Sequence, residues 1–123
     1  VKSHPAYPVN MENFTGLHGK SSIKPIAELL TMCDIVYSGS STSAAVEAYC
    51  AGLPVVVLLD GTSLNMSSLR GYKGVYFVRN FKDLASVINS VEVTSLKEVK
   101  SYFYLDLKLP KWREWLNSGV KDK

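Results

Sequence analysis

The run of small polar residues at positions 38–43 is the part of the sequence best suited to chemistry with a ligand. After one glycine it contains four successive hydroxyl side chains, Ser40, Ser41, Thr42 and Ser43. An alanine-rich segment of helical character follows, and a helix N-terminus offers unpaired backbone N–H groups and a partial positive charge. One hydroxyl would be enough to cap that helix, so four favour a phosphate-binding loop. The alternative is that Thr42 or Ser41 only caps the helix.

Three further polar residues are candidates for the same site. Glu47 lies about one turn into the expected helix, where it either accepts hydrogen bonds from sugar or ribose hydroxyls or lies exposed without a role. His4 follows an apolar start and precedes a proline, and it could donate to a phosphate or to a leaving-group oxygen. Arg70 either pairs with an anion across the cleft or lies on the surface.

The elements expected to position these residues alternate between strand and helix. We expect strands at 1–3, 34–37, 54–59 and 74–78 and helices over 23–33, 44–51 and 81–91. The unbroken apolar run at 54–59 is typical of a central parallel strand that is buried on both faces. The sequence therefore predicts an α/β fold, a Rossmann-like parallel sheet with helices on both faces. Polar segments follow the strands at 4–5, 38–43 and 60–70, so we expect them to meet at the edge where such sheets bind ligands.

Composition limits the class of protein. The chain has 123 residues, enough for a single domain with a core, and 46% apolar with 20% charged residues is typical of a globular protein. Lysine and arginine gather in the expected helical tail at 95–123, which has a break near Pro110. This tail is either a solvated surface or one that lies near anionic lipid, and its basic residues lack the aromatic interleaving of a nucleic-acid site.

The two cysteines have no metal-binding spacing. Cys33 and Cys50 are far apart in the sequence and have no nearby histidines, so zinc is not expected. We expect both to be small buried apolar side chains in a reducing compartment. The absence of an Asp-x-Asp pair likewise gives no reason to expect another metal.

The segment SGSSTSAAVEAYCAGLPVVVLLDG, after a strand, resembles the donor-binding C-terminal domain of GT-B glycosyltransferases. UDP-N-acetylglucosamine 2-epimerases share that architecture. Within the superfamily, KSHP followed by SSTS is similar to motifs of bacterial sialyltransferases and Kdo transferases, which use CMP-sugars. The tail YFYLDLKLPKW is similar to bacterial surface-carbohydrate biosynthesis proteins. The resemblance covers roughly residues 1–90 at the level of the superfamily.

This resemblance implies a glycosyltransferase that moves a sugar from a nucleotide-sugar donor to a saccharide acceptor, without a cofactor. It implies that His4 contacts the phosphate or ribose, that the hydroxyls at 40–43 hold the phosphate, and that Glu47 lies near the nucleotide or sugar. The chain departs from the E-x7-E pattern of retaining diphosphate-donor enzymes, because Gly39 or its neighbour Ser40 stands where the first glutamate would be. That departure favours a monophosphate donor.

We further expect that residues 1–123 form one nucleotide-sugar-binding domain cut from a longer, cytoplasmic protein at the inner face of the membrane. A second, N-terminal Rossmann-like half would supply the general base, so this chain alone would bind nucleotide weakly without turnover. A sugar-nucleotide epimerase or hydrolase on the same fold, and a non-catalytic binding module, are the alternative functions.

Overall fold

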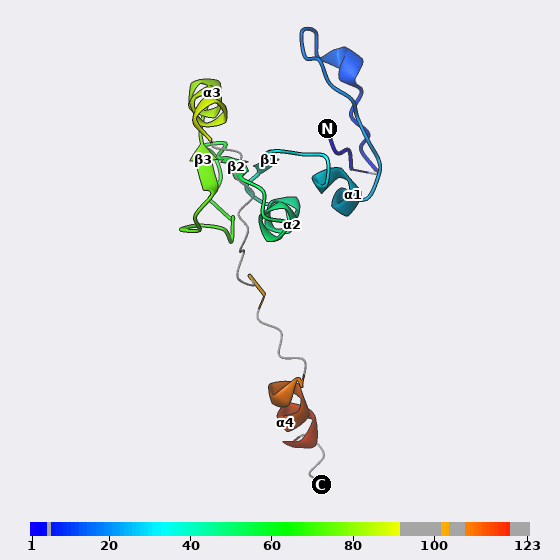
Figure 1. Cartoon of the computed structure of the whole chain (residues 1–123), viewed down its shortest axis with the longest axis vertical. Coiled ribbons are helices and arrows are strands. Elements are labelled where there is room, and N and C mark those ends of the chain that lie inside the picture. The colour runs from blue at the N-terminus through cyan, green and yellow to red at the C-terminus, as the bar shows by residue number, and fades with distance from the viewer. Residues whose placement is uncertain (5, 92–101, 104–107, 119–123) are drawn as a thin grey trace.

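The computed structural model describes residues 1–4, 6–91, 102–103 and 108–118, which form short helices and a small sheet (Figure 1). The elements in chain order are η1 (Met11–Asn13), α1 (Ile26–Leu30), β1 (Val36–Gly39), α2 (Ala44–Cys50), β2 (Val55–Leu58), β3 (Val75–Val78), α3 (Phe81–Ser90) and α4 (Pro110–Ser118). Within these ranges, no helix has both the length and the apolar character needed to cross a membrane.

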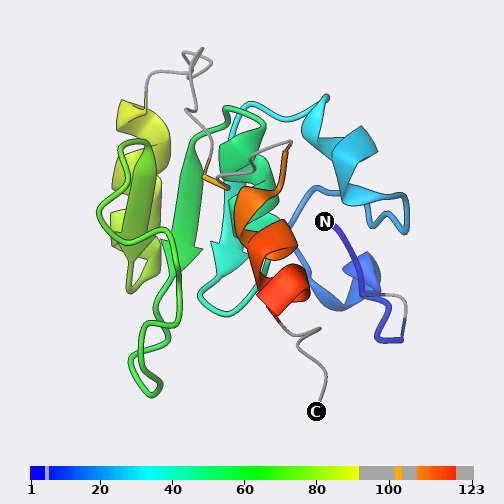
Figure 2. The ribbon, with the colours of Figure 1, turned by 90° about the horizontal axis from the view of Figure 1, so that it is seen from below.

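The sheet has three parallel strands in the order β1-β2-β3 (Figure 2). Val36 pairs with Val55, and Val55 pairs with Val75, so the three strands begin in register. Helix α2 connects β1 to β2 and contacts both strands on one face, while α3 contacts β3 and lies on the opposite side of the sheet in Figure 1. The predicted α/β class with a parallel sheet is therefore confirmed for a sheet of three strands.

Strand β2 forms the centre of the core, as its unbroken apolar sequence predicts. Val55, Val56 and Val57 are all 0% exposed. The side chains of Val55 and Val57 pack into the cluster on the α2 face, which also contains Ala45, Ala48, Tyr49 and Leu69. Val56 points to the other face because successive side chains alternate along a strand. Burial of each valine stabilises the fold by about 1.5–3 kcal/mol.

The end of α2 is set by Gly52, as expected from its position after the alanine-rich segment. Gly52 has φ +80°, a left-handed conformation in which a side chain would be strained. Its N–H donates to the Tyr49 carbonyl at 2.9 Å, and the Leu53 N–H donates to the Ala48 carbonyl at 3.1 Å. These two bonds form a Schellman motif, which ends the helix and turns the chain into β2.

Helix α3 begins where the sequence predicts. The Asn80 side chain accepts hydrogen bonds from the N–H groups of Lys82 and Asp83 at 2.9 and 3.0 Å, so it caps the helix. Helix α4 begins at Pro110, where the sequence indicated a break, because proline fits the first helical position. The rest of the predicted helical tail, at 95–101, 104–107 and 119–123, lies outside the described residues.

The predicted strand at 1–3 is not part of the sheet. Lys2 forms only an isolated parallel bridge with Ser22, through hydrogen bonds of Ser3 N–H to the Ser22 carbonyl and of Ser22 N–H to the Val1 carbonyl. The Ser3 side chain is buried in this local pairing, where it accepts from the Val9 N–H at 3.1 Å. The first segment therefore finds its backbone partners near residue 22 and not along β1.

Three smaller predictions also need correction. The helix predicted over 23–33 is reduced to α1, because Pro25 keeps an extended backbone (ψ 142°) and is only the N-cap. The strand predicted at 34–37 lies at Val36–Gly39. Cys33 and Cys50 are exposed and form no disulfide, contrary to their predicted burial. Cys33 lies in the turn after α1, where its thiol donates to the Leu29 carbonyl at 3.1 Å, and Cys50 is the last residue of α2.

Candidate functional site

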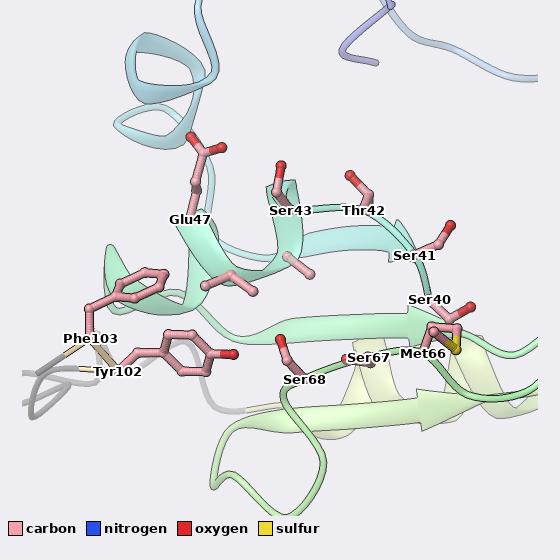
Figure 3. Close-up of a pocket in the computed structure, with 12 residues that line it drawn as sticks. Ser40, Ser41, Thr42, Ser43, Glu47, Met66, Ser67, Ser68, Tyr102 and Phe103 are labelled. Atoms are coloured by element: carbon pink, nitrogen blue, oxygen red, sulfur yellow. The ribbon is translucent and has the colours of Figure 1, made fainter. Parts of the chain in front are cut away.

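A pocket lies beside α2, with Ser40 and Met66 near the C-terminal ends of the parallel strands and Tyr102 and Phe103 toward the opposite ends of the strands (Figure 3). It has a volume of about 500 Å³, and its walls come from three segments: residues 40–43 with 45–47, residues 66–68, and residues 102–103. The first segment follows β1 and the second lies in the loop after β2, which extends beyond the strand ends in Figure 2. Ligands of open parallel sheets bind at this edge, so the pocket is the candidate site.

The four hydroxyl residues after β1 differ in their hydrogen bonding. Thr42 Oγ1 accepts a hydrogen bond from the Ala44 N–H at 3.2 Å, so Thr42 is the residue that caps α2. Ser43 occupies the N-cap position, but its side chain makes no capping hydrogen bond. The hydroxyls of Ser40, Ser41 and Ser43 form no hydrogen bond within the described part of the chain, so they are available to a ligand.

The backbone of α2 contributes less to anion binding than the sequence indicated. The Ser43 carbonyl accepts from the N–H groups of Val46 and Glu47 at 2.9 and 3.0 Å, and Thr42 already satisfies the Ala44 N–H. The helix is also only seven residues long, which limits its dipole. The serine hydroxyls, rather than helix amides, are therefore the main donors that this wall offers.

The loop after β2 turns at Asp60 and Gly61. The Asp60 carboxylate accepts hydrogen bonds at 2.9 Å from the Thr62 N–H, the Ser63 N–H and the Ser63 hydroxyl, while Gly61 takes φ +76°. These donors hold the pKa of Asp60 below its ordinary value, with the Ser63 backbone bond as the largest cause. The carboxylate is thus used to shape the loop, as the predicted turn at this point requires.

The second wall is fixed by a buried leucine. Leu69 is fully buried in the core cluster on the α2 face, and its N–H donates to the Ser67 hydroxyl at 3.3 Å. Ser67 is itself buried, and its N–H donates to Asn65 Oδ1 at 3.0 Å. These contacts hold residues 66–68 opposite the serine loop. In Figure 3, Met66 lies beside Ser40 at one end of the pocket.

The third wall consists of two neighbouring aromatic rings. Tyr102 and Phe103 contact each other edge to face with ring centroids 4.7 Å apart. Tyr102 lies 5.6 Å from the ring of Tyr72, which in turn lies 5.3 Å from the ring of Tyr49 on α2. Because Tyr49 is buried in the core, this series of ring contacts joins the third wall to the fold.

Glu47 is the only charged side chain among the described residues that line the pocket. It is exposed, and its carboxylate forms no hydrogen bond or ion pair with the rest of the described chain. In Figure 3 it points, like the hydroxyls of Thr42 and Ser43, away from Ser68 and the aromatic pair. A carboxylate in this position can accept hydrogen bonds from ligand hydroxyls, and it disfavours ligands of high negative charge.

The structure does not place His4 or Arg70 in the pocket wall. His4 Nδ1 accepts from the Ala6 N–H at 3.2 Å, and its ring lies 5.8 Å from that of Tyr7. The segment carrying His4 pairs with Ser22 and not with the sheet, so its end does not join the other polar loops. Arg70 is exposed just beyond the buried Leu69. The other predicted residues, Ser40, Ser41, Thr42, Ser43 and Glu47, are brought together.

Sequence reasoning missed the residues of the other two walls, which are Met66, Ser67, Ser68, Tyr102 and Phe103. The sequence did contain a signal for the second wall: Ser67 and Ser68 directly precede Leu69, an apolar residue inside a polar loop. Nothing in the local sequence connects the aromatic pair with a loop 60 positions earlier. Within the described ranges, no group of three His, Cys, Asp or Glu side chains is arranged to hold a metal ion.

The fold and the pocket define an α/β protein with a parallel three-stranded sheet and a hydroxyl-containing pocket that extends from its C-terminal edge along α2. Comparison with protein-family models, with curated proteins and with solved structures finds no match to this chain.

Proposed function

We propose that this chain is the donor-binding domain of a glycosyltransferase that acts in bacterial surface polysaccharide biosynthesis. In this proposal the pocket holds a nucleotide-sugar, and the sugar passes to a hydroxyl of a saccharide acceptor. The observation that carries the proposal is the pocket itself, whose described lining starts in the loop after β1 and includes serine hydroxyls without hydrogen bonds and the exposed Glu47 carboxylate.

The chemistry of the walls suits a polyhydroxylated ligand that bears little charge. Ser40, Ser41 and Ser43 offer neutral donors to phosphate or sugar oxygens, and Glu47 accepts from ribose or sugar hydroxyls. No lysine, arginine or histidine is among the lining residues of the described chain. A diphosphate would therefore find no cation among these described residues, which supports a monophosphate donor such as a CMP-sugar over a UDP- or GDP-sugar.

The proposed reaction is displacement at the anomeric carbon. The acceptor oxygen forms the new bond to that carbon while the bond to the donor phosphate breaks, and the phosphate leaves with the bonding electron pair. Serine hydroxyls at the pocket would stabilise the charge that develops on the leaving phosphate. The proton of the acceptor hydroxyl would go to a general base in a second domain, as the resemblance to GT-B enzymes implies.

Titration with nucleotides, followed by backbone amide chemical shifts, tests the binding proposal. We expect CMP to shift residues 40–47 and 66–68 at lower concentration than UDP or GDP, and to leave α3 unchanged. If no nucleotide shifts these residues, the pocket is not a nucleotide site and the proposal fails. If UDP binds more tightly than CMP, the monophosphate-donor proposal is wrong, and the epimerase-like alternative gains support.

Two alanine variants test the assignment of individual residues. Ser41→Ala removes an unpaired hydroxyl, so it should weaken nucleotide binding while leaving the unfolding free energy unchanged. His4→Ala tests the phosphate or ribose contact predicted for this histidine from the sequence. If that contact is made, the variant should have reduced turnover in the full-length enzyme. Because His4 lies outside the pocket wall, it should not alter nucleotide affinity of this chain. Normal turnover with His4→Ala would remove this residue from the catalytic assignment.

We also propose that α4 contacts an anionic membrane surface. Trp112 and Trp115 are 62% and 65% exposed, and their rings meet edge to face with centroids 6.0 Å apart. Lys111 and Arg113 lie on the same short helix. Tryptophan beside basic residues is the combination that favours the interface of an anionic bilayer.

A further inference from the structure

We infer that Tyr102 and Phe103 form a stacking wall that binds the flat face of a ring in the ligand. The ring is either the base of the nucleotide or the pyranose of the sugar, which share an apolar face that can lie against an aromatic side chain. This inference rests on the proposed function, because it concerns the same pocket. It adds a binding role for two residues outside the segments that resemble glycosyltransferases.

The first support is the position of the two rings. Both residues line the same pocket as the serine loop and residues 66–68. Phe103 is 66% exposed, so most of the residue is open to solvent. In Figure 3 the Tyr102 hydroxyl points toward Ser68, which places the ring beside the second wall.

The second support is that the rings are held in place without a ligand. Phe103 meets Tyr102 edge to face, with interplanar angle 82°, and Tyr102 contacts Tyr72. Tyr72 meets the buried Tyr49 edge to face, with interplanar angle 72°. An aromatic wall that is already ordered by such contacts loses little conformational entropy when a ligand binds.

The third support is the charge of the pocket. Among the described lining residues Glu47 is the only charged one, so these residues offer no cation that would attract a phosphate. Hydroxyl contacts alone exchange hydrogen bonds with water for hydrogen bonds with protein, and the net gain from each is small. Contact with an aromatic face does not have this limitation, and for a nucleic-acid base its loss weakens binding by about 5- to 150-fold.

A matched pair of phenylalanine variants tests the inference. Phe103→Ala removes the exposed ring at the pocket, while Phe81→Ala removes a somewhat more exposed ring, 76% exposed, at the start of α3. We expect Phe103→Ala to weaken binding of the ligand whose ring lies on the wall, at least about fivefold for CMP if that ring is the base, and Phe81→Ala to leave binding unchanged. Tyr102→Phe keeps the ring and its contacts, so it should retain most of the affinity, whereas Tyr102→Leu should lose it.

Three ligands distinguish the two sources of the ring: CMP, ribose 5-phosphate and a methyl glycoside of N-acetylglucosamine. If the wall binds the base, CMP binds more tightly than ribose 5-phosphate, and Phe103→Ala abolishes that difference. If the wall binds a pyranose, the glycoside binds the wild-type chain and loses affinity in Phe103→Ala, while CMP and ribose 5-phosphate bind alike. Saturation-transfer NMR would report which ligand protons lie against the protein.

The outcomes separate this inference from the proposed function. If Ser41→Ala weakens CMP binding but Phe103→Ala and Tyr102→Leu bind every ligand with wild-type affinity, the nucleotide site stands and the stacking wall is rejected. If Phe103→Ala weakens binding of the glycoside alone, and no nucleotide binds, the wall stands and the nucleotide-binding proposal fails. If none of the three ligands binds the wild-type chain, both are rejected.

Discussion

Thr42 Oγ1 lies 3.2 Å from the backbone nitrogen of Ala44 and accepts its hydrogen bond, which separates Thr42 from the three serines beside it. Thr42 completes the first turn of α2, whereas Ser40, Ser41 and Ser43 have hydroxyls without such a role in the described structure. One short run of similar residues therefore divides into a structural member and candidate ligand-binding members. The following stability measurement tests this division.

Thr42→Ala should lower the unfolding free energy by about 1 kcal/mol, because it removes a capping acceptor. Thr42→Ser keeps the oxygen and should retain most of the stability. Ser43→Ala should have little effect, since its hydroxyl caps nothing. Urea unfolding of the three variants measures this. A larger loss in Ser43→Ala than in Thr42→Ala would contradict the assigned cap.

Leu69→Ala should destabilise the protein by about 2–5 kcal/mol, because Leu69 is fully buried between the loop after β2 and the core. The same change should loosen residues 66–68 and so weaken ligand binding. Leu64→Ala, in the same loop but exposed, provides the control and should change stability by no more than about 0.5 kcal/mol. Thermal unfolding and hydrogen exchange at residues 66–68 would measure both effects. Equal stability of the two variants would contradict the proposal that Leu69 holds residues 66–68 in place.

Asp60 should contribute to stability at neutral pH and lose that contribution in acid. Its folded-state pKa is lowered from the ordinary value of 3.8 by hydrogen bonds from Ser63 and Thr62. A depressed pKa means that the unfolded chain takes up the proton first, so the contribution is present above pH 3.8 and is lost as pH falls through the lower folded-state pKa. Asp60→Asn should therefore make the unfolding free energy less dependent on pH below about 4. An unchanged acid slope in this variant would show that the turn does not depend on the carboxylate.

Helix α4 should bind vesicles that contain anionic phosphatidylglycerol and not vesicles of neutral phosphatidylcholine. Contact would move Trp112 and Trp115 to a less polar medium, so their fluorescence should shift to shorter wavelength. Replacing Lys111 and Arg113 with glutamate should weaken binding, since each basic residue contributes about 1 kcal/mol near an anionic surface. Lys82→Glu, on the exposed side of α3, is the matched charge control. Equal binding to neutral vesicles would contradict the role assigned to charge.

Elements that depend on neighbouring residues were predicted well from the sequence. The Asn80 cap of α3 and the Gly52 end of α2 follow from side-chain and backbone preferences that act over three or four positions. The burial of β2 follows from an apolar run that leaves no polar face. The length of α1 was overpredicted, because the spacing of apolar residues indicated a helix from residue 23, whereas the extended backbone at Pro25 makes the helix begin at Ile26.

The candidate site was predicted only in its first wall. The serine loop and Glu47 are close in sequence, so a single short segment brings them together. Ser67 and Ser68 lie more than 20 positions after the serine loop, and the burial of their neighbour Leu69 in the core holds them at the pocket. Tyr102 is held there by ring contacts that run through Tyr72 to Tyr49. Such contacts depend on packing between distant segments, which residue periodicity does not encode.

By itself, the sequence determined the alternation of strands and helices, the central position of β2 and the hydroxyl-rich start of α2, because each depends on local conformational preference or on a continuous apolar run. Only the tertiary structure decided that Val1–Ser3 pairs with Ser22 instead of the sheet, and therefore that His4 lies outside the pocket. It also decided which three segments face each other. The physical reason is that strand pairing and side-chain packing join residues according to available partners in space, not according to their separation along the chain.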